Sequence, residues 1–420
     1  MKKTFCLFVL LYARALYGQD SLLTLETCQQ KAREHYPLLQ QKQLLQSIAA
    51  LQVKNDRTAW LPQADLNAQA TYQSDVTSIP IALPNMKVPV LPKDQYKATV
   101  DVKQLIYDGG ATNARQQLRG AQQEAESQKV EVELFKLKQQ VTQTYFNALI
   151  WEERANATTV MMDDIRQRLE RVKAGITNGT TLASQADILN AELLKSEQQL
   201  FEAHNGKSTA MQVMSLLTGI SISENVQLII PPTQLEKGLD VQLRPEVAMY
   251  RFQTDVLSRQ SKITGLANTP KLSAFAQGGY GRPGLNMLDN QFDFFYLAGL
   301  RFNWTIWNWR YNKTEQRAIA LQQQSLAKQS ETFVIGAQSQ LLQQNADIRN
   351  LENALAKDHN IVELRKRVRE VSSAQVDNGV LTVHDYLSDL SAETQAVISR
   401  KTHEIQLVYA IINYNTTKGL

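Results

Sequence analysis

The sequence predicts a mainly α-helical chain with paired β-strands, built as two copies of one helix–β-hairpin–helix unit. Three observations lead to this prediction: an internal repeat, two pairs of alternating polar and apolar segments, and long proline-free stretches with a heptad pattern. The chain has 420 residues, of which 20% are charged and 43% are hydrophobic. This composition is close to that of ordinary globular proteins and excludes a wholly disordered chain.

The first residues have the order typical of a secretory signal, which we assign to 1–18. Lys2 and Lys3 form a charged start and precede an apolar run that is too short to span a bilayer as a helix. Small residues follow, and cleavage after either Gly18 or Ala15 fits the pattern. We therefore expect the mature chain to be exported.

Charge and cysteine usage narrow the class of protein further. Loss of the signal removes three cations and lowers the formal net charge from +4 to +1, so no basic excess indicates a nucleic-acid partner. It also removes Cys6, which leaves Cys28 alone and excludes an internal disulfide. No cysteine stands at a cleavage site, which argues against a lipid-anchored N-terminus.

An internal duplication organises the mature chain. The segment around Pro37 recurs around Pro245 at an offset of 208 residues, and Gly179 recurs as Gly379 at an offset of 200. The second copy is therefore eight residues shorter, between its two strands. The expected divisions are a first repeat over 19–220, a linker over 221–239 and a second repeat over 240–420.

Alternation with a period of two predicts one hairpin in each copy. Polar and apolar residues alternate over 62–73 and 96–104 in the first copy, and over 272–280 and 292–306 in the second. The segments between them are rich in proline or glycine, as loops are. We expect hairpins over about 61–107 and about 270–307.

The remainder of each copy is predicted to be helical. A heptad spacing runs for dozens of residues without a proline, which is typical of coiled-coil packing. The expected long helices cover about 111–177 and about 310–376, and the expected return helices cover about 181–218 and about 381–417. Asn178-Gly179 and Asn378-Gly379 stand at the turns between them.

The strands have the features of membrane strands. They are about ten residues long, have one apolar face, and no other apolar element is left to cover them, although half-burial in a soluble sheet would give the same alternation. Four strands cannot close a barrel, so two, three or four copies must share one. The expected membrane-interface aromatics, on the helix side of the strands, are Trp60, Tyr107, Trp304, Trp307 and Trp309.

The order of repeat, hairpin, long helix and glycine tip resembles the TolC family of outer-membrane efflux proteins over the whole mature chain. The resemblance implies a homotrimer with a shared twelve-stranded barrel in the bacterial outer membrane lipid and helices in the periplasm. It also implies a channel-tunnel of tripartite efflux or type I secretion. This conduit would work with a periplasmic adaptor (membrane fusion) protein and an inner-membrane pump or ABC exporter. It would be a passive channel and not an enzyme.

Candidate functional residues lie at the two expected turns. Asn178, Gly179, Asn378 and Gly379 are candidates for adaptor contact, although a glycine at a plain turn explains the same residues. Asp377 would form a ring of three carboxylates in a trimer and is a candidate pore gate. Arg171 is a second gate candidate, which could pair across the closed tip. A solvated charge is the alternative interpretation for Asp377 and Arg171.

Other functions find little support in the sequence. The five histidines show no metal-site spacing, there is no phosphate-binding glycine loop, and no catalytic constellation stands out. We therefore predict no catalytic residue, no cofactor and no metal. A periplasmic adaptor, or another exported helical interaction protein, is the alternative; an exported helical hydrolase is a more distant one.

Overall fold

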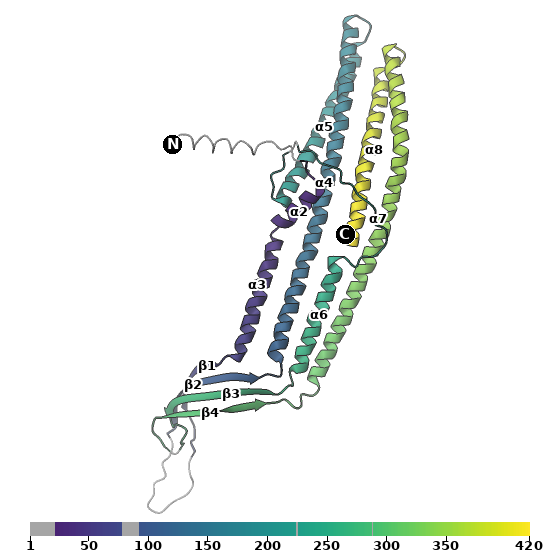
Figure 1. Cartoon of the computed structure of the whole chain (residues 1–420). Helices are drawn as coiled ribbons and strands as arrows, with labels where there is room; N and C mark the ends of the chain where they lie inside the picture. The colour runs from purple at the N-terminus through teal and green to yellow at the C-terminus, as the bar shows by residue number, and fades with distance from the viewer. Residues whose placement is uncertain (1–21, 78–91, 224–225, 288) are drawn as a thin grey trace, which may run out of the picture. The chain divides into compact units, whose positions relative to one another are not determined.

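The computed structural model describes residues 22–77, 92–223, 226–287 and 289–420. The export signal expected over 1–18 and most of the loop expected in the first hairpin lie outside these residues. In chain order the first repeat contains α2 (Leu25–His35), α3 (Leu38–Arg57), the short 3₁₀ helix η1 (Thr58–Trp60), β1 (Gln63–Tyr72), β2 (Asp94–Tyr107), α4 (Ala111–Thr177) and α5 (Ala183–Thr218). The second contains α6 (Pro245–Leu266), β3 (Lys271–Arg282), β4 (Asp293–Asn303), α7 (Tyr311–Asp377) and α8 (Val383–Lys418) (Figure 1).

The described elements confirm the predicted fold class, including its duplication. The long helices α4 and α7 have 67 residues each, and the return helices α5 and α8 have 36 each. Both pairs are related by the same offset of 200 residues that relates Gly179 to Gly379. None of the described helices is long and apolar enough to cross a bilayer.

The chain divides into two compact units, which we describe separately. The first consists of Met1–Lys42, Lys129–Ala248 and Glu331–Leu420, and the second of Gln43–Gln128 and Met249–Ser330. The first unit therefore contains α5, α8 and both helix tips. The second unit contains all four strands and the helix segments that lead into and out of them.

The repeats differ at their first proline. In the first repeat Pro37 separates α2 from α3, and Tyr36 takes an extended conformation, as expected for a residue before proline. In the second repeat Pro245 is the first residue of α6, where its missing N–H costs no hydrogen bond. The same sequence feature therefore breaks a helix in one copy and starts one in the other.

The four strands form one antiparallel sheet in the order β1-β2-β3-β4. Its register aligns Leu66 with Val100, Val100 with Gly278, and Gly278 with Tyr296. The alternating apolar residues of all four strands consequently share one face of the sheet. Among the described residues, the outer edges of the first and last strands, β1 and β4, pair with no further strand.

One strand is shorter than the sequence predicted. The alternation continues to Ile306, whereas β4 ends at Asn303. Its counterpart β2 continues to Tyr107, where it pairs with Leu272 of β3. Residues 304–307, after the end of β4, have no strand beside them on the outer edge among the described residues, because β4 is the last strand and β1 lies at the other edge of the sheet.

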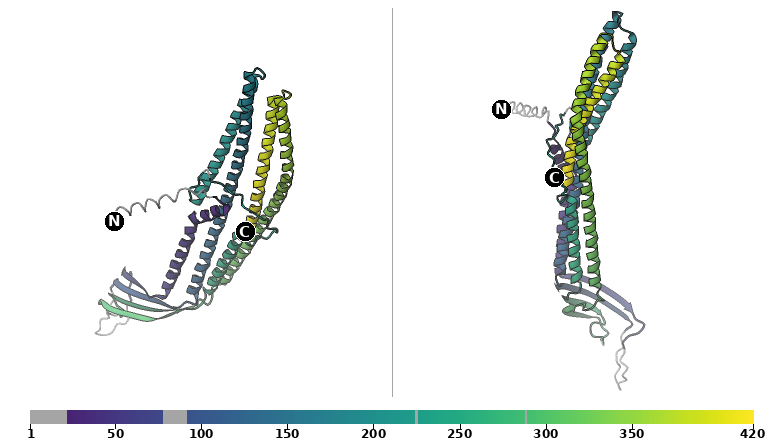
Figure 2. Two further views of the ribbon diagram at one scale, coloured as in Figure 1. Left: turned by 45° about the horizontal axis from the view of Figure 1, so that its top comes forward. Right: turned by 90° about the vertical axis from the view of Figure 1, so that its right-hand side faces the viewer.

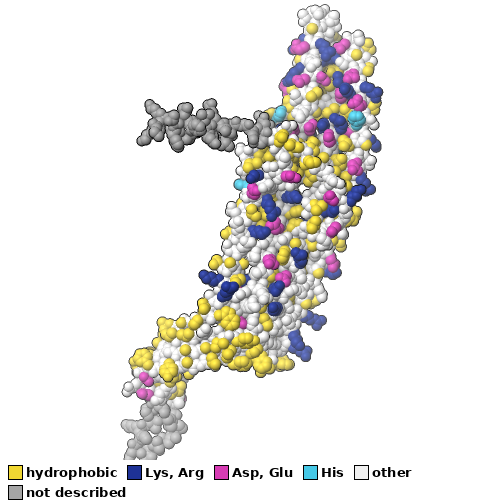
Figure 3. Space-filling model, in the orientation of Figure 1, with side chains coloured by type: hydrophobic (Ala, Val, Ile, Leu, Met, Phe, Trp, Pro, Cys, Tyr) yellow, Lys and Arg dark blue, Asp and Glu magenta, His cyan; other side chains and the backbone are white. Residues whose placement is uncertain are grey.

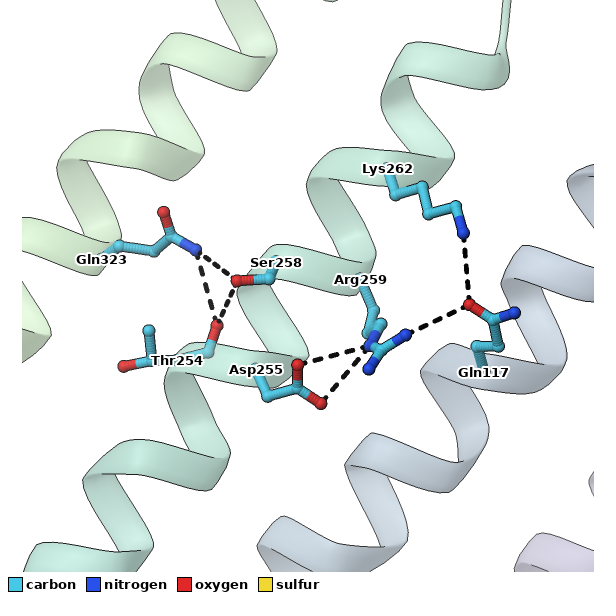
Figure 4. A network of polar contacts seen from close by, with 7 residues as sticks. All are labelled: Gln117, Thr254, Asp255, Ser258, Arg259, Lys262 and Gln323. Atoms are coloured by element: carbon cyan, nitrogen blue, oxygen red, sulfur yellow. Dashed lines mark hydrogen bonds and ion pairs between the residues drawn. The ribbon is translucent and has the colours of Figure 1, made fainter.

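Polar contacts join the helices of the second unit. Figure 4 shows α6 between α4 and α7, where Arg259 Nη1 donates to Gln117 Oε1 at 3.2 Å. On the other side Gln323 Nε2 donates to Ser258 Oγ at 2.9 Å. Since α6 has no fully buried residue, these polar side chains contribute to its contacts within this unit alongside partly buried apolar ones.

Candidate functional site

The two helix tips of the first unit have nearly the same backbone geometry. Gly179 and Gly379 have φ values of +71° and +72°, a region that glycine adopts without a steric cost. Each donates its N–H at 3.0 Å to the carbonyl three residues earlier, that of Ile176 or Val376. The repeated Asn-Gly pair thus ends each long helix with the same left-handed turn.

The residues after the glycines make the two tips different. Thr382 caps α8, since its Oγ1 accepts a hydrogen bond from the N–H of Asp385 at 3.2 Å. Leu182 occupies the same position before α5, provides no side-chain cap and is 71% exposed. At the first tip the residue before the return helix is therefore the exposed apolar Leu182, whereas at the second tip it is Thr382, which caps the helix.

An apolar cluster packs the two helical hairpins of this unit together. Figure 2 shows the ribbons of these hairpins, α4 with α5 and α7 with α8. From α4 and α5 it takes Met161, Ile165, Leu169, Val172 and Leu189, and from α8 it takes Val383, Tyr386, Leu387 and Leu390. Ile165, Leu169 and Val172 are spaced four and three residues apart, as in the predicted heptad pattern, and Met161 departs from it by one residue. This cluster fixes the position of α4 against α8 just behind the tips.

Arg168 crosses this cluster and binds the second tip. Its side chain is 2% exposed and lies over the ring of Tyr386, with Cζ 4.6 Å from the ring centroid. Its guanidinium donates hydrogen bonds to the carboxylate of Asp377 and to the hydroxyl of Ser373. Arg171 approaches the other carboxylate oxygen of Asp377 at 3.4 Å.

Two of the predicted gate residues therefore meet within one chain. Asp377 is half-exposed, and both Arg168 and Arg171 balance its charge. The carboxylate is therefore paired within the chain, and the roles of Asp377 and Arg171 in a pore gate stay predictions. Arg168 is not among the predicted residues, although its position three residues after Ile165 puts it on the buried face of α4.

More polar contacts link α7 to α8 near the same place. Arg369 Nε donates to Glu393 Oε2 at 2.7 Å, and this hydrogen bond raises the pKa of the Arg369 guanidinium. Ser372 donates to the carboxylate of Asp389. Burial raises the pKa of the Tyr386 phenol, so this ring stays neutral beside the guanidinium of Arg168. The tip of α7 is thus held by side chains from both α4 and α8.

The apolar face of the sheet is the second candidate surface. Its side chains are largely exposed in the single chain, with Leu66 at 79%, Phe294 at 80% and Tyr296 at 84%. Hydrophobic side chains gather over the strands in Figure 3, whereas charged side chains are spread over the helices. So large an exposed apolar face is typical of a surface that contacts lipid or protein.

The opposite face of the sheet is polar and hydrogen-bonded across strands. Asp101 of β2 accepts a hydrogen bond from Asn67 of β1 at 2.7 Å and another from Thr99 at 3.1 Å. Gln277 of β3 lies opposite Asp101 and donates its side-chain amide at 2.5 Å. A sheet with one apolar and one polar face has the alternation of a barrel with a water-filled interior.

The predicted interface aromatics lie at one end of this sheet. Trp60 precedes the start of β1, Tyr107 is the last residue of β2, and the three tryptophans follow the end of β4. The exposed fractions of these side chains are Trp60 37%, Tyr107 52%, Trp304 51%, Trp307 67% and Trp309 85%. The rings of Trp307 and Trp309 meet edge to face, with centroids 5.9 Å apart. Their role at a membrane interface stays a prediction.

Two residues after β4 have a strained backbone. Trp309 and Arg310 have φ values of +55° and +61°, which cost a non-glycine residue about 1–2 kcal/mol each. At the equivalent positions of the first repeat the chain has Gly109 and Gly110, with φ values of +68° and +86°. Both repeats therefore make the same turn from strand to long helix, and only the first uses glycine.

The comparisons with known proteins agree with this architecture. The model of the outer membrane efflux protein family matches residues 29–219. No curated protein matches the chain. Among the solved structures, the CmeC outer membrane channel of Campylobacter jejuni is 16% identical, with a TM-score of 0.68, and the alignment covers 94% of this chain and 85% of that one.

Two further structures give similar values. For the outer membrane protein VceC of Vibrio cholerae the identity is 13% and the TM-score 0.67, with coverage of 94% of this chain and 96% of that one. For the open state of the MtrE outer membrane channel of Neisseria gonorrhoeae the identity is 15% and the TM-score 0.68, and the alignment covers 94% of this chain and 88% of that one. At these identities the likeness is one of fold.

Proposed function

We propose that the chain is the outer-membrane conduit of a tripartite export system, because its residues 29–219 match the model of the outer membrane efflux protein family and its fold resembles that of outer membrane channels. The family assigns an efflux channel in the outer membrane and not an enzyme. The finer role is our proposal: substrate arrives from an inner-membrane pump or ABC exporter through a periplasmic adaptor, and it leaves through a barrel shared by three copies.

One observation carries the proposal: the sheet has an exposed apolar face, a polar face and two open edges. Open edges in lipid leave unpaired N–H and C=O groups, each at a cost of several kcal/mol. A ring of chains removes them, because β4 of one copy then pairs with β1 of the next. Three copies supply twelve strands, more than the roughly eight at which bacterial barrels close.

Extraction and assembly state test this proposal. We expect the full chain to sediment with outer membranes, to require detergent, and to form trimers that conduct ions in a planar bilayer. Recovery as a soluble monomer after osmotic shock would contradict the proposal and would favour a periplasmic adaptor.

The helix tips are the proposed adaptor contact and gate. Asn178, Gly179, Asn378 and Gly379 lie at exposed turns, where a partner has access to them. The ion pairs of Asp377 with Arg168 and Arg171 hold the end of α7 against α4, so we propose that opening of the pore breaks them.

Single-channel recording tests the gate. Asp377→Asn keeps the shape of the side chain but removes its charge, so we expect a larger open fraction and altered block by multivalent cations. Asp163→Asn is a matched control, because Asp163 pairs only with Arg166 on the same helix and is exposed. Unchanged open fraction, selectivity and block in Asp377→Asn would remove this residue from the gate.

A further inference from the structure

The junction between β4 and α7 carries cations that its counterpart in the first repeat lacks. The offset of 200 residues places each of them where the first repeat has an uncharged residue: Arg310 at Gly110, Lys313 at Asn113 and Arg317 at Gln117. The first repeat is thus an internal reference, in which the same turn and the same start of a long helix form without these charges.

The three cations lie close together on the surface. Lys313 and Arg317 are four residues apart in α7, which makes them neighbours on one face of the helix, and Arg310 directly precedes the helix. All three side chains are exposed. Glu315 is two residues from both Lys313 and Arg317, so it does not share their face. We call Arg310, Lys313 and Arg317 the cationic patch.

The cationic patch has no counter-charge within the described part of the chain, where no ion pair includes any of its three residues. The first repeat differs in this respect as well. Its cations on α4 face a buried carboxylate, since Arg115 Nη1 lies 3.9 Å and Arg119 Nε lies 3.6 Å from the carboxylate oxygens of Asp56. The cations of the second repeat therefore repel one another with nothing beside them to offset the repulsion.

The start of α7 adds to this imbalance. In the first repeat the carboxylate of Asp108 accepts hydrogen bonds from the N–H of Gly110 at 2.9 Å and of Thr112 at 2.6 Å, which balances the positive end of α4. In the second repeat Asn308 takes that position and donates to Asn268 Oδ1 at 3.0 Å. The first turn of α7 contains no acidic residue. Cations beside the positive end of a helix are unfavourable unless an external anion balances them.

Exposed tryptophans lie next to the cationic patch. Trp304, Trp307 and Trp309 come directly before it in the chain and are all exposed. Figure 3 shows Lys and Arg side chains close to the hydrophobic side chains of the sheet, on the side where α7 begins in Figure 1. Because indoles favour the boundary between hydrocarbon and headgroups, a sheet that lies in a membrane brings the cationic patch to the level of the lipid phosphates.

A neighbouring copy is a poor source of the missing charge. In a shared barrel β4 lies beside β1 of another copy, and α3 leads into β1. Asp56 is the one acidic residue in the sequence of α3, and Arg115 and Arg119 of its own copy already face it. The counter-charge is thus left to a molecule outside the protein.

We propose that the cationic patch binds the headgroup phosphate of an acidic phospholipid, in the leaflet next to the helices. A guanidinium can donate two parallel hydrogen bonds to phosphate oxygens, and the ammonium of Lys313 adds a third positive charge. The three tryptophans suit the adjoining glycerol region and the first part of the acyl chains. This inference rests on the proposed function only in that the sheet lies in a membrane.

Lipid binding by the purified full-length protein tests the proposal. The protein in an uncharged detergent is titrated with phosphatidylglycerol or with phosphatidylcholine, and the bound lipids are counted by native mass spectrometry. We expect a preference for phosphatidylglycerol that weakens as salt is added, because exposed charges are screened. Equal binding of the two lipids would overturn the proposal.

The first repeat provides the variant for this experiment. Arg310→Gly combined with Lys313→Asn and Arg317→Gln gives the second junction the residues of the first. We expect phosphatidylglycerol to bind to this variant at least about tenfold more weakly, and phosphatidylcholine to bind as before. An unchanged affinity for phosphatidylglycerol would overturn the proposal. Lys313→Asn alone repeats the comparison if the triple change prevents assembly.

A matched control removes the same charge elsewhere on α7. Arg365→Gln combined with Lys366→Gln and Arg367→Gln neutralises three exposed cations nearer the tip of this helix. We expect this control to keep the full preference for phosphatidylglycerol. An equal loss in the control would show that net charge, and not the cationic patch, attracts the lipid, and would overturn the site.

Two further outcomes would identify a different occupant and overturn the lipid site. Displacement of the lipid by inorganic phosphate at the same concentration would show that the cationic patch holds a free anion. Loss of trimers in the triple variant, with the lipid preference unchanged, would show that it pairs with a second copy. A trimeric channel that binds both lipids equally overturns this inference alone, whereas a soluble monomer overturns the proposed function with it.

Discussion

At the scale of single residues, the contact between Arg168 and Asp377 decides how the tip of α7 is held. Asp377 was predictable as a charge beside a turn, but its partners were not, because they come from a helix more than two hundred residues earlier. Arg168 is buried among apolar side chains and needs both the carboxylate and the ring of Tyr386 to offset its desolvation.

Arg168→Ala should therefore loosen the tip far more than Arg171→Ala. The first removes a buried cation and leaves a cavity against Tyr386, so we expect a loss of about 2 kcal/mol in local stability. The second removes an exposed cation and should cost less than about 1 kcal/mol. Hydrogen exchange of the amides of 370–380 measures both. Equal protection in the two variants would contradict the dominant role of Arg168.

The tip glycines give a second prediction at this scale. Gly179→Ala forces a side chain into a left-handed conformation, so we expect a loss of about 1–2 kcal/mol at this turn. Gly336→Ala is the control, since position 336 is helical and has open space for a Cβ atom. It should stabilise α7 by about 0.5–1 kcal/mol. Thermal unfolding in detergent measures the two shifts, which should have opposite signs.

At the scale of elements, one carboxylate joins the N-terminal helices to α4. Glu131 accepts from Arg33 Nη2 of α2 and from Lys42 Nζ of α3, both at 2.8 Å. Burial alone would raise its pKa, but the two cationic donors outweigh burial and hold the pKa below its usual value. The bridge therefore depends on an ionised carboxylate.

The sign of the pH dependence follows from the lowered pKa of Glu131. The stabilisation is fully present above the ordinary glutamate pKa of about 4.5 and is lost as the pH falls through the lower value of the folded protein. We expect Glu131→Gln to lower the stability at neutral pH and to reduce its decline in acid. Glu133→Gln removes an exposed ion pair with Lys136 on the same helix, so it should change neither the stability at neutral pH nor its decline in acid. Circular dichroism of unfolding between pH 3 and pH 7 compares the three proteins.

At the scale of the whole molecule, the sheet is the part of the chain that the proposed channel places in the membrane. Its apolar face is exposed in one copy because none of the helices among the described residues covers it. In lipid this exposure is favourable, since the bilayer replaces water on that face. The same face would be an aggregation hazard in an aqueous compartment.

A charge on either face of β1 should therefore have very different consequences. Leu66→Arg places a guanidinium on the lipid side, at a cost of up to about 2–4 kcal/mol near the middle of the bilayer. Gln69→Arg places the same group on the polar face and should be tolerated. The yield of assembled protein in outer membranes compares the two variants. Equal yields would show that the apolar face does not contact lipid.

The sequence by itself determined the periodic features of this protein. The hairpins, the long helices and the glycine turns each depend on residues close together in the chain, where local geometry dictates the pattern, and the duplication is the recurrence of that pattern 200 to 208 residues later. The Gly179 and Gly379 turns could be found because a left-handed residue strongly favours glycine.

Only the tertiary structure decided which distant side chains meet. Arg168 was not distinguishable from other helical cations until α4, α7 and α8 were packed around it, because burial and pairing are properties of the neighbours. The early end of β4 was likewise hidden, since alternation records which way side chains point and not whether a partner strand exists. A strand becomes a strand only when its backbone groups are paired, and for residues 304–307 the described part of the chain provides no partner strand.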